Sequence, residues 1–243
     1  MASIQVYSDP SALANAMIDL FIQMAQVAIH ERGRFSVALS GGSTPKQVYA
    51  GLAEQKVQDQ LLWENIDIFF GDERHVLPTD SESNFRMVQE ALFSKITIPE
   101  KNIYRVQTEC DAESAADAYE ESLRAYFGGT WPRFDLVLLG MGTDGHTASL
   151  FPHTRALTEE RRWFVANPAP SQSTMRLTLT KNAINAARQI VVLVSGKSKA
   201  QMLKEVFHGP YIPEEKPIQL ISPDDGYLLW LLDKDAASQL QQK

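Results

Sequence analysis

Cysteine is almost absent from the sequence. Cys110 is the only cysteine among 243 residues, so no disulfide can form within the chain. Structural disulfides are rare in reducing compartments, and their absence here predicts a cytoplasmic location. The first residues also lack the basic start and apolar core of a secretory signal peptide, so we expect no such leader.

Long apolar runs and an excess of positive charge are also missing. No apolar run approaches the roughly 18 residues expected of a membrane-spanning helix, so we expect no such helix. Lysine and arginine total 23 against 30 acidic residues, which gives a formal net charge of −7. An acidic chain disfavours broad binding to nucleic acids or anionic membranes, although it is compatible with a local basic pocket.

The composition supports a folded core, because 44% of the residues are hydrophobic. This is enough for one large domain or two small ones. Short apolar runs predict buried strands, and apolar residues that recur every three or four positions predict amphipathic helices. The expected strands cover residues 35–39, 66–70, 134–139, 161–166, 176–180, 190–194 and 227–232, with a short strand within 99–106. The expected helices cover residues 11–31, 46–56, 84–93, 112–127, 180–187 and 195–207.

Strands that alternate with helices predict the fold class. We expect an α/β protein with a mainly parallel sheet and helices on both faces, a Rossmann-like three-layer sandwich. The strands that end at residues 39, 70, 139 and 194 each lead into a polar, glycine-containing segment. Open α/β sheets bind their ligands at the carboxyl ends of the strands. We therefore expect these four segments to line one crevice.

The segment after residue 39 has the composition of an anion-binding turn. Residues 40–45 read Ser-Gly-Gly-Ser-Thr-Pro. Ser43 or Thr44 is expected to cap the following helix, and the proline suits its first turn. The N–H groups of Gly41 and Gly42, together with the helix dipole, would then face an anion. The segment is not a P-loop, because the required glycine spacing before Gly-Lys-Ser/Thr is missing.

A second polar segment follows the strand at 66–70. Residues 71–75 read Gly-Asp-Glu-Arg-His, which places Asp72 and Arg74 directly after a buried run. Charged groups at this position suit ligand binding in an open α/β sheet. A solvated, charged turn is the alternative.

The third segment carries the strongest chemical signal. Residues 140–152 contain three glycines and present Asp144 and His146 two positions apart. The glycines permit left-handed backbone angles and a close approach to a ligand. A histidine on such a loop is a candidate general base, because its ordinary pKa lies near neutral pH.

Other functions fit these residues less well. Residues 140–145 match the Gly-x-Gly-x-x-Gly dinucleotide pattern, but Pro152 leaves little room for the helix that would hold a pyrophosphate. His146, His153 and Asp144 do not have the spacing of zinc ligands, so we expect no metal. No Gly-x-Ser-x-Gly elbow is present for a serine nucleophile. A sensor that binds a small ligand on this fold would need an additional output domain, for which a 243-residue chain leaves little room.

Six motifs, in this order, resemble those of the 6-phosphogluconolactonases. They span most of the chain and comprise residues 40–45, 71–74, 80–87, 140–152, 176–180 and the Gly-x-x-Lys-Ala at 196–200. The wider superfamily also contains glucosamine-6-phosphate deaminase. Arg74 stands where the deaminase pattern has tyrosine, and Phe151 takes the place of its catalytic glutamate. Both differences favour the lactonase.

The resemblance implies a fold, a reaction and a cofactor requirement. It implies one domain over residues 1–243, similar to the glucosamine-6-phosphate deaminase fold. The implied reaction is hydrolysis of 6-phospho-D-glucono-1,5-lactone to 6-phosphogluconate in the oxidative pentose phosphate pathway. No metal and no organic cofactor are implied. We expect a sugar-phosphate lactone as the small-molecule partner, and a monomer or weak homo-oligomer.

The resemblance also suggests catalytic roles. His146 would take a proton from the attacking water and return it to the leaving ring oxygen. Asp144 would shape the loop or orient the imidazole. Arg74 would lie near the phosphate or the developing oxyanion, and the N–H groups of Gly41 and Gly42 could hold either charge.

The remaining assignments concern substrate binding. The phosphate would lie at the helix start formed by Ser43 and Thr44, with its charge neutralised by Arg176 and Lys199. Lys197 is an alternative to Lys199, although the family pattern favours Lys199. Asp72 is a candidate acceptor for hydrogen bonds from substrate hydroxyl groups.

Overall fold

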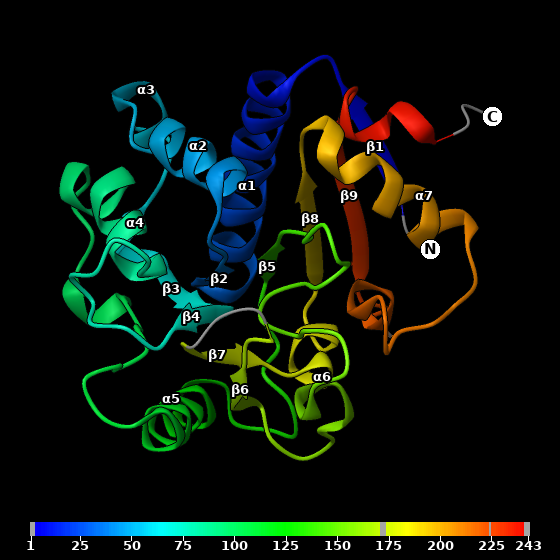
Figure 1. Cartoon of the computed structure of the whole chain (residues 1–243). Coiled ribbons are helices and arrows are strands. Elements are labelled where there is room, and N and C mark those ends of the chain that lie inside the picture. Colours follow the sequence, from blue (N-terminus) through cyan, green and yellow to red (C-terminus); the bar gives the residue numbers. More distant parts are fainter. Residues whose placement is uncertain (1–2, 171–173, 224, 241–243) are drawn as a thin grey trace.

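The computed structural model describes residues 3–170, 174–223 and 225–240 (Figure 1). Its strands are β1 (Ser3–Tyr7), β2 (Phe35–Leu39), β3 (Ile66–Phe70), β4 (Asp72–Arg74), β5 (Leu136–Leu139), β6 (Phe164–Pro168), β7 (Met175–Leu179), β8 (Gln189–Val194) and β9 (Tyr227–Asp233). Its α-helices are α1 (Pro10–Arg32), α2 (Ser43–Leu52), α3 (Gln55–Gln58), α4 (Asn84–Ala91), α5 (Ala112–Phe127), α6 (Lys181–Asn185) and α7 (Ala200–His208). Short 3-10 segments, including one at Lys197–Lys199, join several of these elements.

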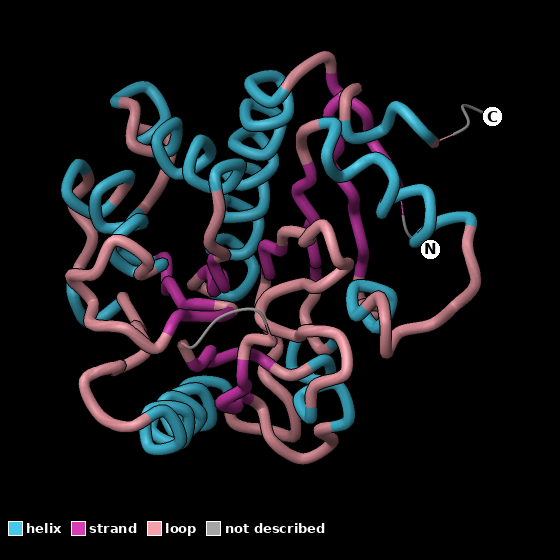
Figure 2. The backbone as a smooth tube through the Cα atoms, in the orientation of Figure 1, coloured by secondary structure: helices cyan, strands magenta, loops and turns pink. Residues whose placement is uncertain are grey.

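Six strands form one sheet in the order β1-β9-β8-β5-β2-β3, and every neighbouring pair in it is parallel. Helices flank this sheet (Figure 2). The prediction of an α/β fold with a mainly parallel sheet is confirmed. The strand order reverses between β5 and β2, because β3 lies on one side of β2 whereas the later strand β5 lies on the other.

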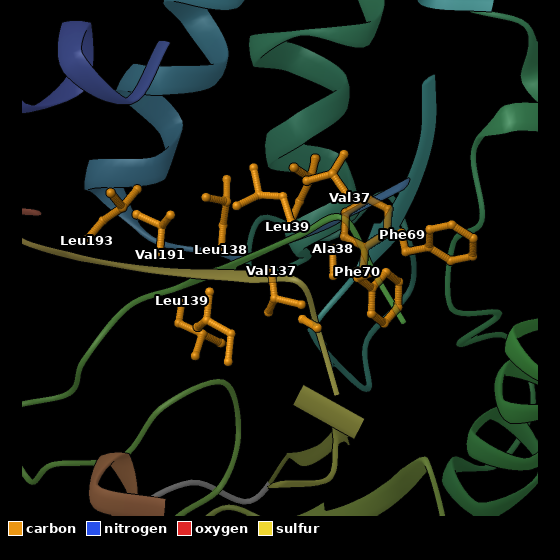
Figure 3. Close-up of a cluster of buried hydrophobic side chains, with 14 of the residues drawn as sticks. Val37, Ala38, Leu39, Phe69, Phe70, Val137, Leu138, Leu139, Val191 and Leu193 are labelled. Carbon is orange, nitrogen blue, oxygen red and sulfur yellow. The ribbon is translucent and has the colours of Figure 1, made fainter. Parts of the chain in front are cut away.

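The central strands are apolar because both faces of the sheet are covered. Every residue of β2, β3 and β5 is buried, as expected for a parallel sheet between helical layers. Successive side chains point to opposite faces: Leu138 lies on one side of the strands and Val137 and Leu139 on the other (Figure 3). Phe35 on β2 meets Phe21 of α1, with ring centroids 5.2 Å apart.

The opposite face of the sheet packs on other helices. Phe69 of β3 is paired with Ala38 of β2, so its side chain lies on the face opposite α1. It contacts Tyr126 and Phe127 of α5. At the far side of the sheet, Trp230 of β9 packs on Phe207 of α7, with ring centroids 4.9 Å apart. Helices therefore cover both faces, as predicted.

Helix α1 begins and ends where the sequence predicts. The Asp9 side chain accepts a hydrogen bond from the N–H of Ala12, and Gly33 ends the helix with φ of 80°. By length and composition alone α1 could cross a membrane. Its apolar residues Leu13 and Met17 are fully buried in the protein core, which is the pattern of a helix that packs on a sheet.

A second, antiparallel sheet was not predicted as a unit. It has the order β4-β7-β6. Residues 72–74, for which a charged turn was the alternative, form strand β4 instead. The strand expected at 161–166 is displaced to β6, because the Glu159 carboxylate accepts the N–H groups of Arg161 and Arg162 in a turn.

Three other details differ from the sequence prediction. The single helix expected at 46–56 is divided into α2 and α3, because the backbone at Glu54 is extended. Residues 99–106 contribute only a bridge between Ile103 and Ile68 rather than a strand. Strand β1, at the exposed edge, was missed because its residues are mostly exposed and form no apolar run.

Candidate active site

A cavity of about 250 Å³ lies at the carboxyl ends of four adjacent strands, β8, β5, β2 and β3. This is the edge at which the strand order reverses between β5 and β2, the usual ligand site of open α/β sheets. The prediction that these strand ends share one crevice is confirmed. The lining residues are Ser40, Gly41, Gly42, Ser43, Thr44, Pro45, Asp72, Arg74, Asn84, Gly140, Met141, Gly142, His146, Ala148, Leu193, Val194, Ser195 and Lys199.

The loop after β5 folds back on itself and presents His146 to the cavity. The N–H of Gly142 donates to the carbonyl of His146 at 2.8 Å, and Gly145 turns the chain with φ of 81°. A Cβ atom at Gly142 would lie 2.2 Å from Nδ1 of His146 and 2.4 Å from Oδ1 of Asp144. Glycine at 142 is therefore required by the close approach of these side chains.

Asp144 fixes the imidazole of His146. Its Oδ1 lies 2.6 Å from Nδ1 of the ring and also accepts the N–H of His146 at 3.2 Å. Partial burial opposes ionisation of Asp144, but its hydrogen bonds with His146 outweigh this effect and lower the pKa of Asp144 to about 2. An ionised carboxylate has no proton to donate, so Nδ1 of His146 must be the donor in this hydrogen bond. In the neutral imidazole the proton is then on Nδ1, and Nε2 has a free lone pair.

Phe151 packs on the imidazole, and Ala148 lies in the same loop with an unusual backbone conformation. The Phe151 ring packs on the His146 ring, with centroids 4.7 Å apart at 49°. Ala148 has φ of 46°, a left-handed conformation that is unusual for a residue other than glycine. Such strained backbone is typical of functional loops. The imidazole is thus held on one side by a carboxylate and on another by an aromatic ring.

The turn after β2 provides backbone N–H groups, but its helix is capped differently from the prediction. Helix α2 begins at Ser43, and its cap is Gly42, which has φ of 103° and makes no side-chain cap. The prediction that Ser43 or Thr44 caps the helix is wrong, because the helix starts one residue earlier. The hydroxyl of Thr44 instead lies 2.7 Å from that of Ser195.

Gly41 is required by a neighbouring side chain. A Cβ atom at Gly41 would lie 2.0 Å from Oδ1 of Asn84. Asn84 begins helix α4, lines the cavity and donates from Nδ2 to the carbonyl of Asp72 at 2.9 Å. It therefore joins the turn after β2 to the first residue of β4.

Alternation along β4 decides which of its charged groups face the cavity. Asp72 and Arg74 line the cavity, whereas Glu73 points away from it. The Glu73 carboxylate accepts the N–H groups of Arg74, Asn84 and Phe85. Burial raises the pKa of Glu73, and these hydrogen bonds oppose that shift. Glu73 therefore holds the start of α4 against β4.

Asp72 is buried and fixed by side chains from other elements. Its exposed fraction is 7%, and Oδ2 accepts from the hydroxyl of Ser149 at 2.7 Å. The N–H of Ser149 in turn donates to the hydroxyl of Thr178 on β7. These contacts link the His146 loop to strands β4 and β7 of the small sheet.

Two arginines lie opposite each other beside the cavity. Arg74 of β4 pairs directly with Arg176 of β7 in the antiparallel ladder. Arg176 is 5% exposed and does not line the cavity itself. Burial lowers the pKa of Arg176, and the charge of Arg74 lowers it further. Like charges placed directly opposite are destabilising, and the nearby carboxylates of Asp72, Glu82 and Glu73 offset part of this repulsion.

Lys199 supplies a third cation at the other side of the cavity. It lines the cavity, whereas Lys197 is exposed and does not. Burial lowers the pKa of the Lys199 ammonium, and the charge of Asp144 opposes that shift. Of the two lysines that the sequence left open, Lys199 is the one that lines the cavity together with His146.

Three residues at or next to this site, Asn84, Ser149 and Ser195, have no role predicted from the sequence. Asn84 and Ser149 occur within the motifs at 80–87 and 140–152, so a signal for them was present in the sequence. Ser195 directly follows the apolar run of β8 but carries no motif of its own. In the described part of the chain, no three His, Cys, Asp or Glu side chains are grouped closely enough to hold a metal ion.

Comparisons with known proteins agree with this architecture. Residues 8–230 match the family described as glucosamine-6-phosphate isomerases/6-phosphogluconolactonase. A curated 6-phosphogluconolactonase from Synechocystis sp. is 45% identical over 218 residues, which is 88% of each chain. The crystal structure of 6-phosphogluconolactonase from Trypanosoma cruzi superposes with a TM-score of 0.87 and 31% identity, and covers 100% of this chain and 98% of that one.

The fold is also shared outside the lactonases. A monomeric glucosamine-6-phosphate deaminase superposes with a TM-score of 0.81 over 98% of this chain and 99% of that one. At 22% identity this similarity shows the fold alone. It confirms the predicted similarity to the glucosamine-6-phosphate deaminase fold.

Proposed function

Because the chain belongs to the glucosamine-6-phosphate isomerase/6-phosphogluconolactonase family, we propose that it hydrolyses 6-phospho-D-glucono-1,5-lactone with His146 as the general base. The reaction is the opening of 6-phosphogluconolactone by water, a step of the pentose phosphate pathway. One observation supports this most directly. An imidazole held at Nδ1 by Asp144 lines the same cavity as Arg74 and Lys199.

The proposed reaction begins with water between His146 and the lactone carbonyl. Nε2 of His146 takes a proton as the water oxygen bonds to the carbonyl carbon. The tetrahedral oxyanion then collapses, the bond from the acyl carbon to the ring oxygen breaks, and Nε2 returns the proton to that oxygen. The products are the carboxyl and hydroxyl groups of 6-phosphogluconate. Asp144 acts in this scheme by holding the imidazole in the tautomer with a free Nε2.

The cationic residues are assigned to the two negative charges of the reaction. Lys199 and the start of α2 at Ser43 and Thr44 would bind the phosphate. Arg74 would stabilise the phosphate or the oxyanion, with Arg176 beside it adding positive potential. Gly41 and Gly42 also line the cavity, and their N–H groups could hold either charge.

Asp72 is assigned to the sugar hydroxyl groups. It lines the cavity, and Ser149 fixes one of its carboxylate oxygens. A carboxylate has about four acceptor positions, so Asp72 can still accept from a substrate hydroxyl. The prediction of its role made from the sequence therefore stands as a proposal.

A deaminase reaction is the second candidate, because the fold is shared. The deaminase pattern places a glutamate where this chain has Phe151. In this structure the Phe151 ring packs on His146 and offers no carboxylate for proton transfer. This contact favours the lactonase.

The experiment that tests the function compares three substrates. Purified protein is assayed for acid release from 6-phosphogluconolactone and from unphosphorylated gluconolactone, each against buffer alone because such lactones open spontaneously. Ammonia release from glucosamine 6-phosphate is measured in parallel. We expect turnover of the phosphorylated lactone to be strongly preferred. No acceleration over buffer, or efficient ammonia release, would contradict the proposal.

A cytoplasmic location, a monomeric or weakly oligomeric state and a single domain over residues 1–243 stay predictions from the sequence. They can be checked by cell fractionation, by sedimentation and by limited proteolysis, respectively.

A further inference from the structure

The hydroxyl groups of Thr44 and Ser195 connect two of the loops that line the cavity. Thr44 lies in the first turn of α2 after β2, and Ser195 directly follows β8. Their oxygens are 2.7 Å apart, the length of a well-formed hydrogen bond between hydroxyl groups. Both residues line the cavity that also contains Lys199.

Two hydroxyl groups that share one hydrogen bond leave one proton unused. Whichever oxygen donates, the accepting hydroxyl keeps its own proton. Across residues 3–170, 174–223 and 225–240, neither hydroxyl has a second hydrogen-bond partner. A phosphate monoester offers only acceptor oxygens to such a proton. The pair is therefore suited to donate to a phosphoryl oxygen.

The position of Ser195 is fixed from behind the cavity. The N–H of Gly196 donates to both carboxylate oxygens of Asp233 at 3.0 Å, and Asp233 is only 1% exposed. Asp233 also accepts the N–H of Ala236, so it is held at the end of β9. A buried anchor of this kind limits the movement of the adjoining serine.

We propose that the Thr44–Ser195 hydroxyl pair donates a hydrogen bond to the phosphoryl group of the substrate and so contributes to the preference for phosphorylated lactones. Lys199 supplies charge in the same cavity, whereas the hydroxyl pair supplies a short, directional donor. The two oxygens act as a unit, because each hydroxyl orients the other. This inference rests on the proposed lactonase function and adds Ser195 to the residues that contact the substrate.

The test compares Ser195→Ala with the hydroxyl-retaining variant Ser195→Thr. Calorimetry measures the Kd for 6-phosphogluconate, and kinetics gives kcat and KM for the phosphorylated and unphosphorylated lactones. Ser195→Ala should weaken 6-phosphogluconate binding about ten- to a hundredfold, the range for a hydrogen bond to a charged group. It should leave kcat/KM for unphosphorylated gluconolactone unchanged, and Ser195→Thr should restore most of the affinity.

Two further variants sharpen the result. Ser198→Ala is the control, because Ser198 is exposed on the 3-10 segment Lys197–Lys199 that follows Ser195 and lies outside the cavity lining. Thr44→Ala combined with Ser195→Ala should weaken binding by less than the product of the single effects, because the two hydroxyls depend on each other.

Specific outcomes would overturn the inference. They are an unchanged Kd for 6-phosphogluconate in Ser195→Ala, or an equal loss toward the unphosphorylated lactone. Failure of the proposed function is distinguishable, because then the wild-type protein would not accelerate lactone opening. Binding of 6-phosphogluconate can be measured in either case.

Discussion

At the scale of single residues, His146 and Asp144 lie on the same loop and are joined by a hydrogen bond between their side chains. From the sequence, Asp144 could shape the loop or orient the imidazole, and the structure has a contact for each. Its carboxylate accepts the backbone N–H of His146, which shapes the loop, and it lies 2.6 Å from Nδ1, which orients the ring. The residue-scale predictions follow from this arrangement.

Replacing the proposed base should slow the chemical step. If general-base catalysis contributes roughly 10²- to 10⁴-fold, His146→Ala should lower kcat for 6-phosphogluconolactone by about that factor. Steady-state kinetics with subtraction of the spontaneous rate measures the effect. His208→Ala, at the exposed end of α7, is the matched control. A kcat near the wild-type value in His146→Ala would remove His146 from the mechanism.

The Asp144 carboxylate should contribute stability that depends on pH. Its pKa in the folded protein is about 2, below the ordinary value of 3.8. The contribution is therefore fully present above pH 3.8 and is lost as the pH falls toward 2. Urea unfolding of wild type and Asp144→Asn at pH 6 and pH 3 should show a stability difference that shrinks at the lower pH. The side chain is 51% exposed, so we expect a small effect. A difference that grows on acidification would contradict the assignment.

At the scale of elements, the site depends on where loops leave the strands. Side chains alternate along a strand. In β4, Asp72 and Arg74 therefore face the cavity, whereas Glu73 between them points away from it. The loop after β5 depends on Gly142, whose missing side chain leaves room for both Asp144 and His146.

Filling that space should disturb catalysis. In Gly142→Ala the added Cβ would lie 2.2 Å from Nδ1 of His146, so the ring must move. We expect kcat to fall at least tenfold, since small displacements of reacting groups are costly. Gly140→Ala, in the same loop, is the comparison, because its Cβ would meet no atom within 4 Å. Equal activities for the two variants would show that the contact at 142 is unimportant.

For the whole molecule, the cavity and its surroundings bring together three cations, Arg74, Arg176 and Lys199, from three different elements. Arg74 and Arg176 face each other across two strands, and Lys199 is partly desolvated nearby. Placing these charges together has an electrostatic cost, which a bound dianion should reduce. Ligand binding to the folded state alone must then raise its stability.

Thermal unfolding with product provides the measurement. At about 100 times its Kd, 6-phosphogluconate should add roughly 2.7 kcal/mol, which corresponds to about 5–10 °C in Tm for a domain of this size. Gluconate at the same concentration is the ligand control and should give a much smaller shift. Lys199→Ala should lose much of the shift while Lys197→Ala keeps it. Identical shifts for both lysine variants would argue against the phosphate role of Lys199.

The sequence by itself determined the parallel sheet, because β2, β3, β5 and β8 are covered on both faces and are therefore largely apolar runs. It also indicated which loops meet at the cavity, because a glycine-rich turn, an Asp-Gly-His loop and the segment with Lys199 each follow such a run. Only the tertiary structure decided which of the charged groups meet. The helix start at Ser43, the choice of Lys199 over Lys197 and the links from Asn84 and Ser149 to Asp72 depend on contacts between residues far apart in the chain. Local propensity does not encode such contacts, since they arise when separate elements pack against one another.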